Sequence, residues 1–148
     1  MSKNNFLMLH STTSLRVRYA DTDPMKYVYY GNYAEYLEVA RVELFRGIGM
    51  SYDEIENRGI WLPVSEFRIR YLKPARYDQI LTIETYVKKI PGVRIEFEYE
   101  IFGEQGERIS EASTTLFFLD SSNNKIIKCP DFLMQLIQNN WQQDKLVP

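Results

Sequence analysis

The sequence predicts an α+β domain in which one antiparallel β-sheet wraps around a long central helix. One observation is a helical repeat of apolar residues over about 32–47, and a second is the run of segments with two-residue alternation that follows it. A third is that strand-helix-strand alternation of the parallel type is missing. We expect a single domain over residues 1–148, with its core at about 14–128 and a C-terminal helix at about 130–141.

A change of period marks the first strand and the long helix. Residues 15–19 alternate between apolar and basic side chains, which is typical of a half-buried strand. The helix that follows ends near Gly47 and Gly49. Its apolar stripe consists of Tyr33, Tyr36, Leu37, Ala40, Leu44 and Ile48. Apolar residues outside this stripe predict a second covering surface, such as a partner subunit: Val39, Val42 and Phe45.

The rest of the chain is expected to form mainly strands. A short helix or turn is expected at 51–58. Strands are expected at 66–71, 80–88, 93–101, 109–119 and 125–128. The segment 93–101 is the clearest, because apolar and charged side chains alternate along its whole length. Pro91-Gly92 and the glycines at 103 and 106 supply turns between strands.

Charge and cysteine content exclude several classes of function. The chain has 18 basic and 20 acidic residues, so we expect no nucleic-acid partner, since binding of that kind needs a basic surface. The one cysteine, Cys129, excludes an intramolecular disulfide and suits a reducing compartment. No segment approaches a signal peptide or the roughly 20 apolar residues of a membrane span. We therefore expect a cytoplasmic protein without a membrane span.

The sequence lacks the residues and motifs of several common catalytic mechanisms. The only histidine, His10, lies in an N-terminal segment that we expect to be mobile, so a serine or cysteine nucleophile has no histidine base. Motifs of esterase elbows, zinc proteases and nucleotide-binding loops are missing. Asp21 and Asp23 lack a third ligand nearby, so we expect neither a metal nor a cofactor. Carboxylates, tyrosines and backbone dipoles must carry any reaction.

The segment 19–33 places two carboxylates and several tyrosines immediately before the long helix. The unpaired N–H groups of a helix start can bind an oxyanion, and a carboxylate beside them can act as base or nucleophile. Pro24 favours an extended conformation at Asp23. The residues alone leave two interpretations open: a polar turn that caps the strand, or a catalytic site.

Four segments in the same order resemble the 4-hydroxybenzoyl-CoA thioesterase-like family of acyl-CoA thioesterases. These are Tyr-Ala-Asp-Thr-Asp-Pro at 19–24, Val-Tyr-Tyr-Gly-Asn-Tyr at 28–33, Glu-Val-Ala-Arg-Val-Glu at 38–43 and Tyr-Leu-Lys-Pro-Ala-Arg-Tyr-Asp at 71–78. The resemblance covers roughly residues 14–119. It implies the hotdog fold, in which an antiparallel sheet wraps a long helix. It also implies hydrolysis of an acyl-CoA thioester to a free acid and coenzyme A.

The resemblance implies roles for individual residues. Asp23 would be the nucleophile or general base, and the backbone N–H of Tyr30, with Gly31 beside it, would polarise the thioester carbonyl. Lys26 stands where the family commonly has glycine, and it could intrude on the acyl pocket or pair with a substrate carboxylate or with Asp21. Further tyrosines would line the acyl pocket or serve as core and interface residues: Tyr27, Tyr29 and Tyr33.

A basic cluster at one strand connection is expected to bind the phosphates of coenzyme A, or else to be a solvated hairpin: Lys88, Lys89 and Arg94. Glu38 and Arg41 are spaced for an ion pair within the helix. We expect a homodimer or homotetramer. Two other functions stay open, namely a noncatalytic acyl-CoA or lipid-binding protein and an acyl thioester dehydratase.

Overall fold

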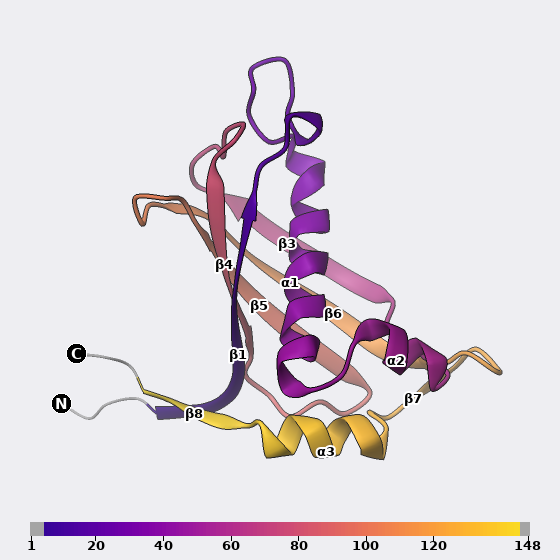
Figure 1. Cartoon of the computed structure of the whole chain (residues 1–148). Coiled ribbons are helices and arrows are strands. Elements are labelled where there is room, and N and C mark those ends of the chain that lie inside the picture. The colour runs from indigo at the N-terminus through magenta and orange to yellow at the C-terminus, as the bar shows by residue number, and fades with distance from the viewer. Residues whose placement is uncertain (1–4, 146–148) are drawn as a thin grey trace.

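An antiparallel sheet curves around one long helix, α1, in the computed structural model, which describes residues 5–145 (Figure 1). The helices are η1 (Tyr19–Asp21), η2 (Tyr30–Asn32), α1 (Tyr33–Ile48), α2 (Tyr52–Asn57) and α3 (Asp131–Asn139). The strands are β1 (Asn5–Arg16), β2 (Ile60–Trp61), β3 (Val64–Tyr71), β4 (Ile80–Val87), β5 (Arg94–Phe102), β6 (Arg108–Asp120), β7 (Lys125–Ile127) and β8 (Gln142–Lys145). The expected α+β arrangement is confirmed.

The strand order places β4, β5 and β6 in the middle of the sheet. The order is β2-β6-β5-β4-β1-β8, and β3 and β7 also pair with β6, always antiparallel. Because β6 has 13 residues, it can pair with β5 and β7 along one side and with β2 and β3 along the other. The helix α1 lies across one face of this sheet (Figure 1).

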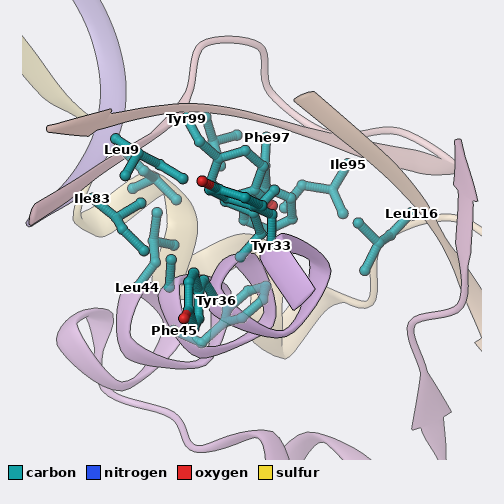
Figure 2. Close-up of a cluster of buried hydrophobic side chains, with 14 of the residues drawn as sticks. Leu9, Tyr33, Tyr36, Leu44, Phe45, Ile83, Ile95, Phe97, Tyr99 and Leu116 are labelled. Carbon is teal, nitrogen blue, oxygen red and sulfur yellow. The ribbon is translucent and has the colours of Figure 1, made fainter. Parts of the chain in front are cut away.

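Alternation along the strands decides which side chains meet α1. In β4 and β5 every second residue is buried, and Ile95, Phe97 and Ile101 are 0% exposed. Figure 2 shows side chains of the sheet, such as Phe97 and Tyr99, pointing toward Tyr33 and Phe45 of α1. The predicted faces of these strands are therefore confirmed, and the charged residues between them lie on the outer face.

The helix α1 buries a broader face than its sequence stripe predicts. Phe45 falls outside the sequence stripe, yet it is 0% exposed and its ring lies 6.0 Å from that of Phe97, so the sheet of the same chain covers it. Val39 is exposed in the single chain, and its expected covering by a partner subunit stays a prediction. The difference arises because residues one position apart, such as Leu44 and Phe45, can both reach a sheet that curves around the helix.

Arg41 is buried on α1 instead of pairing with Glu38. Its guanidinium donates from Nη1 to the Tyr99 hydroxyl at 3.1 Å, and that hydroxyl lies 2.6 Å from Thr114 Oγ1. Among the described residues, the Arg41 Nε has no hydrogen-bond partner and no carboxylate forms an ion pair with Arg41. The predicted intrahelical pair with Glu38 is therefore absent from the described part of the chain.

The N-terminal strand is longer than the sequence predicts. Of the strand expected at 15–19, only Leu15 and Arg16 belong to β1, which begins at Asn5, and Tyr19 lies in η1 instead. The expected mobility of His10 is wrong, because this residue pairs with Tyr86 of β4 and its Nε2 lies 2.7 Å from Glu84 Oε1. Polar residues between 10 and 14 hide this strand from a hydropathy pattern, and only the pairing with β4 defines it.

Candidate active site

A backbone hairpin immediately before α1 brings the sequence-predicted residues together. The Asp23 N–H donates to the Tyr27 carbonyl at 2.8 Å, and the Tyr29 N–H donates to the Asp21 carbonyl at 2.9 Å. The loop between β3 and β4 supports the hairpin, since the Val28 N–H donates to the Ala75 carbonyl at 2.9 Å. Asp23 and the start of α1 therefore lie on opposite limbs of one short, hydrogen-bonded hairpin.

Asp23 holds the tip of this hairpin with one carboxylate oxygen. Its Oδ1 accepts hydrogen bonds from the backbone N–H groups of Met25 at 2.9 Å and Tyr27 at 3.2 Å. The other oxygen, Oδ2, has no hydrogen-bond partner within residues 5–145. Asp23 is half-buried. A fixed carboxylate with one free oxygen can act as a base or a nucleophile.

The helix start, which follows the same hairpin, offers free backbone donors. In the described part of the chain, the N–H groups of Tyr30 and Gly31 have no hydrogen-bond acceptor. They open η2, which runs directly into the 16 residues of α1. The positive end of the helix dipole lies at this point, so the two N–H groups can stabilise a developing oxyanion.

Asp21 is the structural anchor of the hairpin. Its carboxylate is buried and accepts from the Tyr36 hydroxyl at 2.9 Å, the Arg18 N–H at 3.1 Å and the Arg18 guanidinium at 3.0 Å. Burial alone raises the pKa of Asp21, but the hydrogen bonds from Arg18 and Tyr36 outweigh it, so this pKa lies below its ordinary value. The Asp21 carbonyl also accepts from the Asn32 side chain at 2.8 Å.

Aromatic side chains gather around the helix start. The Tyr29 ring lies beside Gly31, where an added Cβ would come within 3.0 Å of that ring, and it stacks at a tilt on Tyr30. Tyr33 is buried, whereas Tyr29 and Tyr30 are exposed. Tyr71, at the end of β3, contacts the rings of both Tyr30 and Tyr33. A planar acyl group would find aromatic surface on this side of the site.

Lys26 and Tyr27 form the outer end of the hairpin. Lys26 is exposed and has a φ of 64°, a left-handed conformation that an L-residue adopts at a cost. Tyr27 pairs with Arg76 through an isolated bridge, and the Arg76 guanidinium lies over the Tyr27 ring at 5.1 Å. Lys26 and Arg76 are thus the cations that the structure places next to the hairpin tip.

The predicted phosphate-binding residues lie at the opposite end of the sheet. Lys88 and Lys89 follow the end of β4, whereas the Asp23 hairpin contacts the loop before the start of β4 (Figure 1). The eight residues of β4 span about 25 Å. Lys88 pairs with Glu98 at 3.1 Å and Lys89 with Glu96 at 3.6 Å, and Arg94 is exposed nearby. Within one chain, this basic cluster therefore lies far from Asp23.

The sequence interpretation missed two residues that shape the site. Asn32 ties the helix start to Asp21, and the Tyr71 hydroxyl donates to the Tyr30 carbonyl at 3.0 Å. The signal for Tyr71 was present, because it opens the segment 71–78 that resembles the family. A hollow of about 820 Å³ lies on the outer face of the sheet among residues such as Arg70 and Glu111, which pair at 2.8 Å. It is separate from the Asp23 hairpin.

Comparison with known proteins establishes the family. The profile of the thioesterase-like superfamily matches residues 17–137, which include the whole hairpin and α1. The chain belongs to the thioesterase-like superfamily. This membership confirms the predicted resemblance, the hotdog fold and the enzyme class, a thioester hydrolase.

Individual relatives agree with this assignment. YneP of Bacillus subtilis (strain 168), provisionally named an acyl-CoA thioesterase, is 31% identical over 118 residues, covering 80% of this chain and 86% of YneP. The acyl-CoA thioester hydrolase YbgC of Escherichia coli O157:H7 is 28% identical over 106 residues, covering 72% and 79%. A DHNA-CoA thioesterase from Staphylococcus aureus has a solved structure with a TM-score of 0.78 and 37% identity, covering 80% of each chain.

No helix in the described part of this superfamily member combines the length and hydrophobicity needed to cross a membrane.

Proposed function

We propose that this protein hydrolyses an acyl-CoA thioester, with Asp23 as the general base or nucleophile and the N–H groups of Tyr30 and Gly31 as the oxyanion donors. The observation that carries the proposal is the hairpin that joins a carboxylate with a free oxygen to a helix start with free donors. Relatives named for acyl-CoA hydrolysis support coenzyme A as the thiol of the substrate.

Hydrolysis through a general base proceeds in two steps. Asp23 takes a proton from water as the water oxygen attacks the thioester carbonyl carbon, and the resulting oxyanion accepts hydrogen bonds from Tyr30 and Gly31. The intermediate then collapses, the C–S bond breaks, and the leaving thiolate takes the proton from Asp23. In the nucleophilic version, Asp23 itself attacks, releases the thiolate and forms an anhydride that water hydrolyses.

Binding of the coenzyme A phosphates involves the basic residues at the far end of β4 only if a second subunit is present. Lys88, Lys89 and Arg94 lie about one strand length from Asp23 of the same chain. We therefore propose a homodimer or homotetramer in which this cluster serves the site of a neighbouring subunit. The phosphates would compete with Glu96 and Glu98 for the two lysines.

The acyl group is proposed to lie against Tyr27, Tyr29 and Tyr33, with Lys26 at the outer end of the hairpin. We also propose a cytoplasmic location, which suits the unpaired thiol of Cys129, whose pKa burial raises to about 12. A thiol that stays protonated at neutral pH does not take part in the reaction. No cofactor enters the proposed steps.

Asp23→Asn tests the proposal, because the amide oxygen can still accept the bonds from Met25 and Tyr27 while the base is lost. Thiol release from a panel of acyl-CoA substrates should fall at least about 100-fold with little change in the melting temperature. Asp53→Asn on the exposed face of α2 is the matched control and should keep full activity. Full activity of Asp23→Asn would remove Asp23 from the reaction.

Two measurements separate the remaining alternatives. Binding of acyl-CoA without thiol release by the wild-type protein would favour a noncatalytic binding protein over a thioesterase. A single turnover in ¹⁸O-labelled water distinguishes the two roles of Asp23, since a general base delivers the label to the product at once. If Asp23 is the nucleophile and water attacks the Asp23 carbonyl carbon of the anhydride, the label of the first turnover enters the Asp23 carboxylate.

A further inference from the structure

Tyr71 connects the edge of the sheet to the start of α1. It is the last residue of β3, and its hydroxyl donates to the Tyr30 carbonyl oxygen at 3.0 Å across 41 residues of sequence. The same carbonyl oxygen accepts the Tyr33 N–H within the first helical turn. Both lone pairs of this oxygen are therefore used, one by the helix and one by the sheet.

The geometry of the peptide unit links this bond to the oxyanion donor. The Tyr30 carbonyl and the Gly31 N–H belong to one planar trans peptide, so they point in opposite directions. A bond that fixes the direction of the carbonyl therefore fixes the direction of the Gly31 N–H as well. Polarisation of the carbonyl also makes the N–H on the same peptide a stronger donor.

Tyr71 is well placed to act as a rigid support. It pairs with Ser110 of β6, and the N–H groups of Leu72 and Lys73 both donate to the Ile109 carbonyl, at 2.9 and 3.0 Å. The ring of Tyr71 meets that of Tyr33 edge-on, with centroids 5.2 Å apart. Burial raises the pKa of the Tyr71 hydroxyl, with a further contribution from Tyr30, so the hydroxyl remains a donor at neutral pH.

The helix start itself has few other restraints. The three residues of η2 lack a side-chain cap, and first turns of helices fray in general. The Asn32 side chain restrains the far end of η2 through Asp21, but Tyr71 contacts the first peptide itself.

We propose that Tyr71 is a positioning residue that holds the peptide between Tyr30 and Gly31 in the orientation needed to bind the oxyanion. Its kinetic consequence rests on the function proposed above. Tyr71 acts through the backbone and not on the substrate, so it contributes to the turnover rate and not to substrate affinity.

Tyr71→Phe is the informative variant, because it removes only the hydroxyl and keeps the ring contacts with Tyr30 and Tyr33. Loss of a complete oxyanion donor costs about 100-fold to 1000-fold in kcat, so a loss of orientation should cost about 10-fold, with KM unchanged within about twofold. The matched control is Tyr86→Phe, which removes a hydroxyl bonded to Glu100 at 3.3 Å on the outer face of the sheet. It should keep the wild-type kcat.

A measurement that does not depend on turnover tests the same bond. In labelled protein, the Tyr30 carbonyl carbon should shift upfield in Tyr71→Phe when the second hydrogen bond is lost, and the Gly31 amide signal should move with it. Neither signal should move in Tyr86→Phe. Unchanged signals in Tyr71→Phe would overturn the positioning role. If the wild-type protein is active, an unchanged kcat in Tyr71→Phe would overturn it as well.

Failure of the proposed function gives a different result from failure of the positioning role. If the wild-type protein releases no thiol from any acyl-CoA, the thioesterase proposal fails, and the resonance shifts still decide whether Tyr71 orients this peptide. An effect of Tyr71→Phe on KM alone would mean that the hydroxyl contacts substrate, which contradicts the positioning role.

Discussion

Removal of the Asp21 carboxylate should loosen the whole hairpin before α1. Asp21→Ala deletes three hydrogen bonds and leaves the Tyr36 hydroxyl, on a side chain only 5% exposed, without its acceptor. In Asp21→Asn, the remaining oxygen can still accept hydrogen bonds from the Tyr36 hydroxyl and the Arg18 N–H. The new NH₂ group faces the Arg18 guanidinium, but the Arg18 side chain is 70% exposed and can turn toward water.

The structure predicts different losses in the free energy of unfolding for the two variants. An unsatisfied buried hydroxyl costs about 1–3 kcal/mol and the exposed pair with Arg18 adds little, so Asp21→Ala should lower the free energy of unfolding by up to about 3 kcal/mol. Asp21→Asn should cost about 1 kcal/mol. For a chain of this length the melting temperature falls by about 2–4 °C for each kcal/mol.

The assay is thermal unfolding followed by circular dichroism, from pH 7 down to the acid range. The pKa of Asp21 is lower in the folded than in the unfolded chain, so its ionised form stabilises the fold above the unfolded value of about 4. This stability is lost as the pH falls through the folded pKa. The gap between wild type and Asp21→Asn should therefore narrow below about pH 4.

Two outcomes would refute this reasoning. One is an Asp21→Ala protein as stable as Asp21→Asn, which would mean that the Tyr36 bond contributes nothing. The other is a gap between wild type and Asp21→Asn that stays constant down to pH 2, which would mean that the ionised carboxylate is not the stabilising form.

Two further changes test the hairpin tip and the buried cation. Lys26→Gly should be about 1 kcal/mol more stable than Lys26→Ala by urea unfolding, because only glycine adopts the φ of 64° without strain, and equal stabilities would contradict this reasoning. Arg41→Met should change the free energy of unfolding by less than about 1 kcal/mol or raise it, since the Tyr99 hydroxyl keeps Thr114 as a partner while a buried charge is removed. A loss above about 2 kcal/mol in the same assay would contradict this reasoning.

Much of the fold follows from local pattern. The period of 3.6 in α1 and the alternation of β4 and β5 are visible in the sequence because each side chain either meets the opposing layer or meets water. The sequence does not show where β1 begins. Its polar stretch becomes a strand only through pairing with β4, so His10 seemed mobile when it is in fact held at the sheet.

The candidate site likewise combines residues that the sequence predicts with contacts that only the fold creates. The sequence by itself determined the hairpin residues, because Asp23, Tyr30 and Gly31 lie within nine positions of one another and local backbone bonds connect them. Only the tertiary structure decided that Tyr71 reaches Tyr30, that Arg41 is buried against Tyr99, and that Lys88 lies a strand length from Asp23. The physical reason is that strand pairing joins residues distant in sequence, and it leaves no periodic signal in the chain.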